Sequence, residues 1–277
     1  MKIDLRDEAL SKYDGYLKDK LSEQCRDQSN PSFGQYNLLA HLSTYFDNDI
    51  IVDIGTGGQA ISARALSYNK TNTVYSYDTE FSEIAKGYIG RLDNVIYEVS
   101  NPLNASKDRD IMMSASLISL DVDPHDGEQE SEFYSFFVDN NWKGVMICDD
   151  IRMGWDNVNN NHITMALFWE YVNKPKYDLT TTRYSHNTGT GLICFDDQEV
   201  FFKLDPNKAS DDPHKWVTSF NHTTVERFDD GTFETNYGVT GTWSSVVDDA
   251  GEEKILLKTK SGSIEIPNKP RSTPSGK

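Results

Sequence analysis

The sequence predicts an α/β protein whose Rossmann-like doubly wound sheet is followed by a small C-terminal antiparallel β-meander. Three observations predict this. Buried strands alternate with amphipathic helical segments between residues 50 and 172, and this order produces a parallel sheet covered on both faces. A glycine-rich loop follows the first of these strands. After residue 203 the pattern changes to short alternating strands separated by turn signals such as Asp230-Gly231.

The expected elements follow from hydrophobic periodicity. Helical patterns at 1–28 and 35–46 precede the first buried strand. From there, strands are expected at 50–54, 73–77, 95–99, 116–120 and 144–148, and helices at 59–68, 79–89, 128–140 and 161–172. Residues 177–202 are expected to close the sheet as a β-hairpin. The C-terminal meander is expected to have strands at 223–228, 232–237, 241–247, 254–258 and 263–266.

The 277 residues are enough for one α/β domain and a smaller unit. We expect the α/β domain, with its N-terminal helices, at 1–203. The polar, proline-bounded segment 204–214 predicts a linker. A small all-β domain is expected at 215–267, and a disordered tail at 268–277.

Composition narrows the partners and the location. The net charge of −17, without a cluster of Lys and Arg in the sequence, argues against nucleic acid as a partner. The sequence has no apolar segment of membrane-spanning length, and its charged start lacks the apolar core of a signal peptide. The three cysteines are scattered, which is typical of reduced thiols. We therefore expect a cytoplasmic protein that acts without a membrane; association into a homo-oligomer stays open.

The segment 53–58 (DIGTGG) ends the first buried strand and leads into a helix. Its glycines let backbone N–H groups approach a ligand closely, and the helix N-terminus favours a negative group. Gly55, Gly57 and Ala60 also fit the G-x-G-x-x-A pattern of dinucleotide-binding folds. The glycines therefore fit NAD as well as S-adenosylmethionine, and a turn without a ligand is the structural alternative.

Two acidic residues complete the predicted cofactor site, and one of them favours S-adenosylmethionine. Asp53 stands two residues before the first glycine, where a carboxylate can face the methionine ammonium; in dinucleotide folds this position is usually apolar. Asp78 ends the next strand and is placed to accept both ribose hydroxyls, which either cofactor allows. The cofactor-binding residues are thus predicted as a set: Asp53, Gly55, Thr56, Gly57 and Asp78. An NAD-dependent oxidoreductase is the alternative.

A second group of polar residues follows the fourth and fifth strands: Asp121, Asp123, His125, Asp149 and Asp150. In a doubly wound sheet both strands end at the same edge, next to the cofactor crevice. Crowded carboxylates repel one another, and protonation or a bound cation relieves the repulsion. Oxygen ligands indicate Mg²⁺, Mn²⁺ or Ca²⁺. Such an ion would hold a substrate hydroxyl and lower its pKa.

These residues resemble the metal-dependent class I O-methyltransferases, which include catechol and caffeoyl-CoA enzymes and the macrocin- and novobiocin-type sugar methyltransferases. The segment 120–151 is closer to the sugar branch, in which an Asp-x-Asp loop precedes a Gly-x-x-x-x-Asp-Asp strand. The segments MALFWEYV and NTGTGLICF are similar to small methyltransferase-like proteins, some of them viral or glycan-associated. The resemblance covers residues 30–202.

The resemblance implies that Asp121, Asp149 and Asp150 bind Mg²⁺ or Mn²⁺. The expected activity is metal-assisted transfer of a methyl group from S-adenosylmethionine to a hydroxyl, with a sugar or glycan as the small-molecule acceptor. A non-catalytic module that holds a glycan or partner through aromatic residues of the β-meander is a further alternative.

The identity of the general base stays open. Where sugar methyltransferases commonly have Leu or Tyr after the Asp-x-Asp loop, this sequence has Pro124-His125. His125 could take a proton near neutral pH, or it could simply cap the following helix. Asp121 and Asp123 are the other candidates for the catalytic base.

Overall fold

The computed structural model describes residues 1–13, 33–153, 165–180, 182–185, 188–202, 225–227, 231–235, 240–247, 253–259 and 262–267. The chain divides into two compact units, Met1–Phe202 and Lys203–Lys277. The predicted linker at 204–214 and tail at 268–277 lie outside the described residues.

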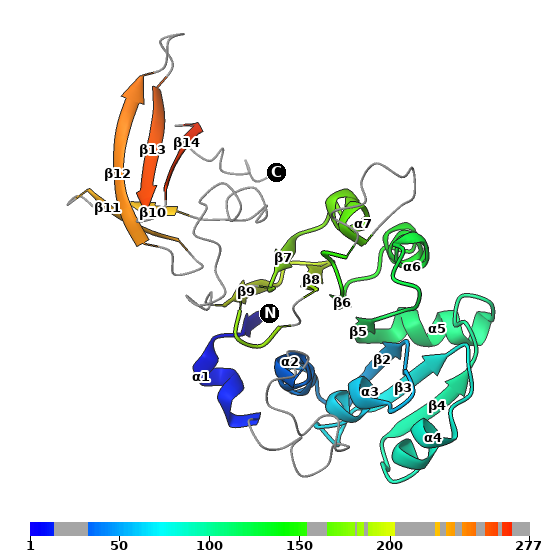
Figure 1. The fold of residues 1–277 in the computed structure, drawn as a ribbon. Helices are drawn as coiled ribbons and strands as arrows, with labels where there is room; N and C mark the ends of the chain where they lie inside the picture. The colour runs from blue at the N-terminus through cyan, green and yellow to red at the C-terminus, as the bar shows by residue number, and fades with distance from the viewer. Residues whose placement is uncertain are drawn as a thin grey trace, which may run out of the picture. The chain divides into compact units, whose positions relative to one another are not determined.

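A seven-stranded sheet forms the centre of the first unit (Figure 1). Its strands, in spatial order, are β4 (Val95–Val99), β3 (Thr73–Asp78), β2 (Ile50–Ile54), β5 (Ala115–Leu120), β6 (Val145–Asp149), β8 (Thr190–Cys194) and β7 (Lys176–Asp178). The strands from β4 to β6 are parallel, whereas β8 is antiparallel to both of its neighbours. The direction of winding reverses between β2 and β5. Ligands bind at the carboxyl ends of the strands at such a reversal.

Helices cover both faces of this sheet, which confirms the predicted doubly wound fold. The helices are α2 (Phe33–Ser43), α3 (Ile61–Leu66), α4 (Glu83–Ile89), α5 (Ser106–Ser114), α6 (Glu128–Asp139) and α7 (Met165–Tyr171). One core packs Val52 and Ile54 of β2 with side chains of α5, α6 and α7, such as Phe137. A separate apolar cluster joins α3 and α4 through Ala63 and Ala85. Because side chains alternate along a strand, Asp53 points to the opposite face from Val52 and Ile54.

The start of the chain differs from its prediction. Residues Lys2–Asp4 form strand β1, which pairs in parallel with β9 (Glu199–Phe201), and only then do α1 (Asp7–Leu10) and the 3-10 turn η1 (Ser11–Tyr13) follow. The expectation of a helix from residue 1 was therefore wrong at this end. Burial of Ile3, which has no exposed surface, and pairing with β9 override the local helical pattern.

The end of the first unit also differs in part. Strands β7 and β8 form the predicted antiparallel hairpin at the edge of the large sheet. β9 does not extend that hairpin, because it pairs with β1 in a separate two-stranded sheet. Within the described residues, no helix combines the length and apolar character needed to cross a bilayer.

The described part of the second unit is one antiparallel sheet in which each strand pairs with the next along the chain, as predicted for a meander. Its strands are β10 (Val225–Arg227), β11 (Thr232–Thr235), β12 (Thr240–Val247), β13 (Glu253–Thr259) and β14 (Gly262–Pro267). Several aromatic residues of the β-meander, through which it could hold a glycan or a partner, lie outside the described residues, namely Trp216, Phe220, Phe228 and Tyr237.

Candidate active site

A cavity of about 520 Å³ lies where β2, β3 and β5 end, at the reversal of the sheet. Its volume is within the roughly 300–1,000 Å³ range of small-molecule sites. Gly55, Gly57 and Asp78 line one part of it, and Asp121 and His125 line another. The predicted cofactor loop and the predicted catalytic residues therefore share one cavity.

The two glycines of the loop are required for different reasons. Gly55 has φ +92°, and a Cβ atom built on it would lie 1.6 Å from the backbone oxygen of Asp121. Its lack of a side chain thus allows the ends of β2 and β5 to touch, and the backbone N–H of Asp121 donates to the Ile54 oxygen at 2.9 Å. Gly57, with φ +63°, has no atom within 4 Å of its built Cβ. Gly57 therefore leaves the cavity wall open for a ligand.

Asp78 both lines the cavity and holds the loop. Its Oδ2 accepts the backbone N–H of Gly57 at 2.9 Å, and its Oδ1 accepts that of Glu80 at 2.9 Å. Thr56 is buried, and its hydroxyl lies 2.6 Å from that of Ser76, away from the residues that line the cavity. Of the predicted cofactor set, Gly55, Gly57 and Asp78 line the cavity and Thr56 supports the loop from behind.

Asp53 is completely buried and is not part of the cavity wall. The hydroxyl of Ser76 donates to its Oδ2 at 2.7 Å, whereas Oδ1 has no partner of hydrogen-bonding geometry in the described part of the chain. Burial raises the pKa of Asp53 to about 7, although the hydroxyls of Ser76 and Ser62 oppose the rise. Contact between Asp53 and the methionine ammonium stays a prediction.

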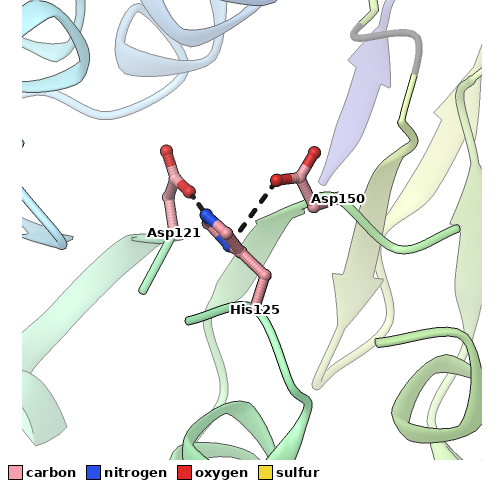
Figure 2. A group of neighbouring side chains, drawn as sticks. All are labelled: Asp121, His125 and Asp150. Carbon is pink, nitrogen blue, oxygen red and sulfur yellow. Dashed lines mark ion pairs between the residues drawn. The ribbon is translucent and has the colours of Figure 1, made fainter. Parts of the chain in front are cut away.

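Asp121, His125 and Asp150 come together beside the cavity (Figure 2). His125 Nδ1 lies 3.8 Å from Asp121 Oδ1 and 3.5 Å from Asp150 Oδ2. One ligand atom from each of the three residues lies within 4.8 Å of the other two. Such a mixed nitrogen and oxygen group suits a divalent cation.

His125 also contacts Asp123, the other candidate base, with 3.1 Å between Nε2 and Oδ1. The ring does not cap α6. The N-cap residue of that helix is Gly127, and the Asp126 carboxylate accepts the backbone N–H of Glu128 at 3.0 Å. The imidazole is thus surrounded by carboxylates, and the helix-cap interpretation is not what the structure shows.

The two adjacent acids after β6 have different surroundings. Asp149 Oδ1 accepts the backbone N–H of Asp150 at 2.9 Å, so Asp149 lies outside the group of three. Asp150 has φ +57°, in the left-handed region, and the Thr188 hydroxyl donates to its carboxylate. Such a conformation persists only where surrounding structure enforces it. The structure gathers Asp121 and Asp150 of the predicted metal set, with His125 instead of Asp149.

Several residues that line the cavity are not among the residues predicted from the sequence. Phe81, Asn101, Gln129 and Phe133 line the cavity from the segments that follow β3, β4 and β5. Their positions after strand ends were the available signal, since such segments meet at one edge of the sheet. Glu130 of α6 is buried, neither of its carboxylate oxygens has a hydrogen-bond partner among the described residues, and burial raises its pKa.

No family model and no curated protein sequence matches the chain. Solved structures do match. A Klebsiella pneumoniae protein provisionally described as an O-methyltransferase is 14% identical, with 69% of this chain and 90% of that chain covered and a TM-score of 0.46. The Streptomyces achromogenes O-methyltransferase TomG in complex with SAM is 17% identical, with 68% and 90% covered and a TM-score of 0.43. A Bacillus cereus O-methyltransferase in complex with SAH is 18% identical, with 68% and 91% covered and a TM-score of 0.44. The chain is thus similar to O-methyltransferase structures at low sequence identity.

Proposed function

We propose that the protein transfers a methyl group from S-adenosylmethionine to a hydroxyl group of a small molecule, assisted by a divalent cation. The single observation that carries the proposal is the shared cavity. Gly57 and Asp78 line it on the cofactor side, and Asp121 and His125 line it where β5 ends. A bound cofactor and a hydroxyl beside the Asp/His group would then be close enough to react.

The residues of the loop would bind and orient the cofactor. The open backbone at Gly57 and the carboxylate of Asp78, which already fixes the loop, support this role. S-adenosylmethionine supplies a methyl group that is already activated. The remaining task of the protein is to place the acceptor oxygen in line with that methyl group and to remove its proton.

Asp121, Asp123 and His125 all line the cavity and are the candidates for that proton transfer. The Asp121/His125/Asp150 group fits a divalent cation in charge and in spacing. Such an ion supplies positive charge that favours the deprotonated form of a bound hydroxyl. The side chain of Asp150, which is only 9% exposed, would provide a rigid anchor in this group.

A sugar or glycan is the acceptor class that we propose. The cavity wall combines hydrogen-bonding groups with aromatic rings such as Phe81 and Phe133. Gln129 donates from its amide to the backbone oxygen of Asp123 at 2.8 Å, and Phe133 lies on the same wall. This mixture suits a polyhydroxyl compound with one apolar face, and the resemblance of residues 120–151 to sugar methyltransferases points the same way. The net charge of −17 supports a small molecule rather than nucleic acid, and the unpaired Cys148 and Cys194 fit a cytoplasmic location.

Calorimetry and a transfer assay test the proposal. Titration with S-adenosylhomocysteine should show binding, whereas NADH should not bind. Labelled methyl groups should then be transferred in a screen of monosaccharides, nucleotide sugars and catechols with Mg²⁺ or Mn²⁺. Asp121→Asn should abolish transfer, and Asp139→Asn, at an exposed position at the end of α6, should leave it unchanged. NADH binding without S-adenosylhomocysteine binding would replace the proposal by the oxidoreductase alternative.

A further inference from the structure

We propose that His125 is itself a ligand of the metal ion, through Nδ1 and together with Asp121 and Asp150, and that Asp149 is not a ligand. The inference rests on the divalent cation of the proposed function and assigns its ligand set. It also predicts that the site prefers Mn²⁺ to Mg²⁺.

The spacing of the three side chains is the first argument. Nδ1 of His125 lies 3.8 Å from Asp121 Oδ1 and 3.5 Å from Asp150 Oδ2. These separations are too long for hydrogen bonds. Two ligands bound at about 2.1 Å lie roughly 3.0 Å apart at a right angle and about 3.6 Å apart at 120°. The separation from Asp150 lies within that range and the one from Asp121 is slightly longer, so small side-chain movements would bring the three groups onto one ion.

The other ring nitrogen is the second argument. Nε2 of His125 lies 3.1 Å from Asp123 Oδ1, and that carboxylate fixes the ring proton on Nε2 when the imidazole is neutral. Nδ1 then carries the lone pair, and Figure 2 shows the carboxylates of Asp121 and Asp150 on either side of the ring. Three electron-rich atoms that converge on one point suit a bound cation, which a neutral imidazole can share with the two carboxylates. A carboxylate on the remote nitrogen is the usual companion of a metal-bound histidine.

The backbone explains why Asp150 rather than Asp149 joins the group. The left-handed conformation of Asp150 turns its side chain toward His125. Thr188 fixes that orientation, because its hydroxyl donates to Asp150 and its backbone oxygen accepts the N–H of Arg152 at 2.8 Å. Asp149 instead accepts the backbone N–H of Asp150. The two adjacent acids thus have different partners, Thr188 and His125 for Asp150 and the backbone N–H of Asp150 for Asp149.

The donor set determines the choice of ion. Mg²⁺ takes oxygen ligands almost exclusively and loses its water reluctantly, whereas imidazole nitrogen suits first-row transition metals. Mn²⁺ accepts carboxylate and imidazole together. We expect Mn²⁺ to bind at least about tenfold more tightly than Mg²⁺, since an all-carboxylate set would discriminate less.

Pulsed electron paramagnetic resonance on the full chain loaded with Mn²⁺ tests the assignment. A directly bound imidazole should give ¹⁴N hyperfine coupling in the unmodified protein. His125→Gln should lose this coupling. Titration calorimetry should show that the same variant binds Mn²⁺ about tenfold or more weakly, because one ligand is missing. Asp149→Asn should keep the coupling and change affinity less than threefold. Asp139→Asn is the matched control for the loss of one exposed carboxylate.

Three outcomes would overturn the inference. The first is Mn²⁺ binding without ¹⁴N coupling. The second is a loss of Mn²⁺ affinity in Asp149→Asn as large as that in His125→Gln, and the third is no Mn²⁺ binding by the unmodified protein. Titration of S-adenosylhomocysteine on the same samples verifies that each variant is folded. If His125→Gln does not fold, the spectrum of the unmodified protein decides. If the unmodified protein does not bind S-adenosylhomocysteine, the proposed function is wrong. A ¹⁴N-coupled Mn²⁺ ion would still support the ligand assignment.

Discussion

Replacement of Asp53 by Asn should stabilise the protein at neutral and alkaline pH. Burial raises the pKa of Asp53 in the folded protein to about 7, from an ordinary value of 3.8. The folded state therefore keeps the proton over a pH interval in which the unfolded state has already lost it. Between about pH 4 and pH 7 the folded state binds more protons, so its stability falls as the pH rises.

The size of this effect follows from the shift. About three pKa units at 1.36 kcal/mol each correspond to about 4 kcal/mol of lost stability, fully developed above pH 7. Asparagine mimics the protonated carboxyl, and its side-chain oxygen can still accept the hydroxyl of Ser76. Asp53→Asn should therefore match the unmodified protein near pH 4 and exceed its unfolding free energy by up to about 4 kcal/mol at pH 8.

Urea unfolding of both proteins at half-unit steps from pH 4 to pH 8 measures this difference. Subtraction of the two curves removes the contributions of groups that titrate equally in both proteins. A difference that does not change with pH would show that the Asp53 carboxyl titrates alike in the folded and unfolded states, and would refute the reasoning. Ser76→Ala is the matched comparison, because loss of the hydroxyl that lowers the pKa of Asp53 should extend the pH dependence to higher pH.

Four further predictions concern the loop, the cavity and the core. Gly55→Ala should prevent folding or destabilise the protein by more than about 3 kcal/mol, because its Cβ would collide with the backbone oxygen of Asp121. Gly57→Ala is strained only in φ and should cost about 1–2 kcal/mol of unfolding free energy in the same urea assay. Equal effects of the two substitutions would contradict the different roles of the two glycines. Asp78→Ala should weaken S-adenosylhomocysteine binding by about tenfold or more in calorimetry, since it removes the acceptor that fixes the loop; unchanged affinity would exclude this role. Exhaustive chelation should abolish methyl transfer and added Mn²⁺ should restore it, whereas full activity after chelation would remove the cation from the proposal. Trp142→Phe should cost about 1–3 kcal/mol in thermal or urea unfolding, because the buried Ala115 oxygen loses its donor at 2.7 Å, and an unchanged midpoint would show that another donor replaces it.

The central strands were predictable because their signal is local. Residues 50–54 and 95–99 form strands with the predicted bounds, since each is a short, largely apolar run between turn residues. Strand β1 was not predictable, because three residues carry no periodicity and its partner β9 lies at the far end of the unit. Its existence depends on tertiary pairing, which no local pattern reports.

The candidate site was predictable in its place and less so in its details. Topology alone brings the segments after β5 and β6 to one edge, where Asp121, His125 and Asp150 meet. The choice between two adjacent acids depends on one backbone angle, the positive φ of Asp150. The burial of Asp53 follows from the helices that cover both faces of the sheet, since Val52 and Ile54 on the other face are buried as well, and the motif alone does not report that cover.

The pairing of β1 with β9 has a consequence for the order in which the chain acquires its structure. During synthesis at about 5–20 residues per second, residues 2–4 emerge long before their partner at 199–201. Ile3 must wait exposed throughout that interval, whereas β2 and β3, which are neighbours in the sheet, can pair early. Strand β1 is therefore made before most of the unit and is among its last strands to be paired.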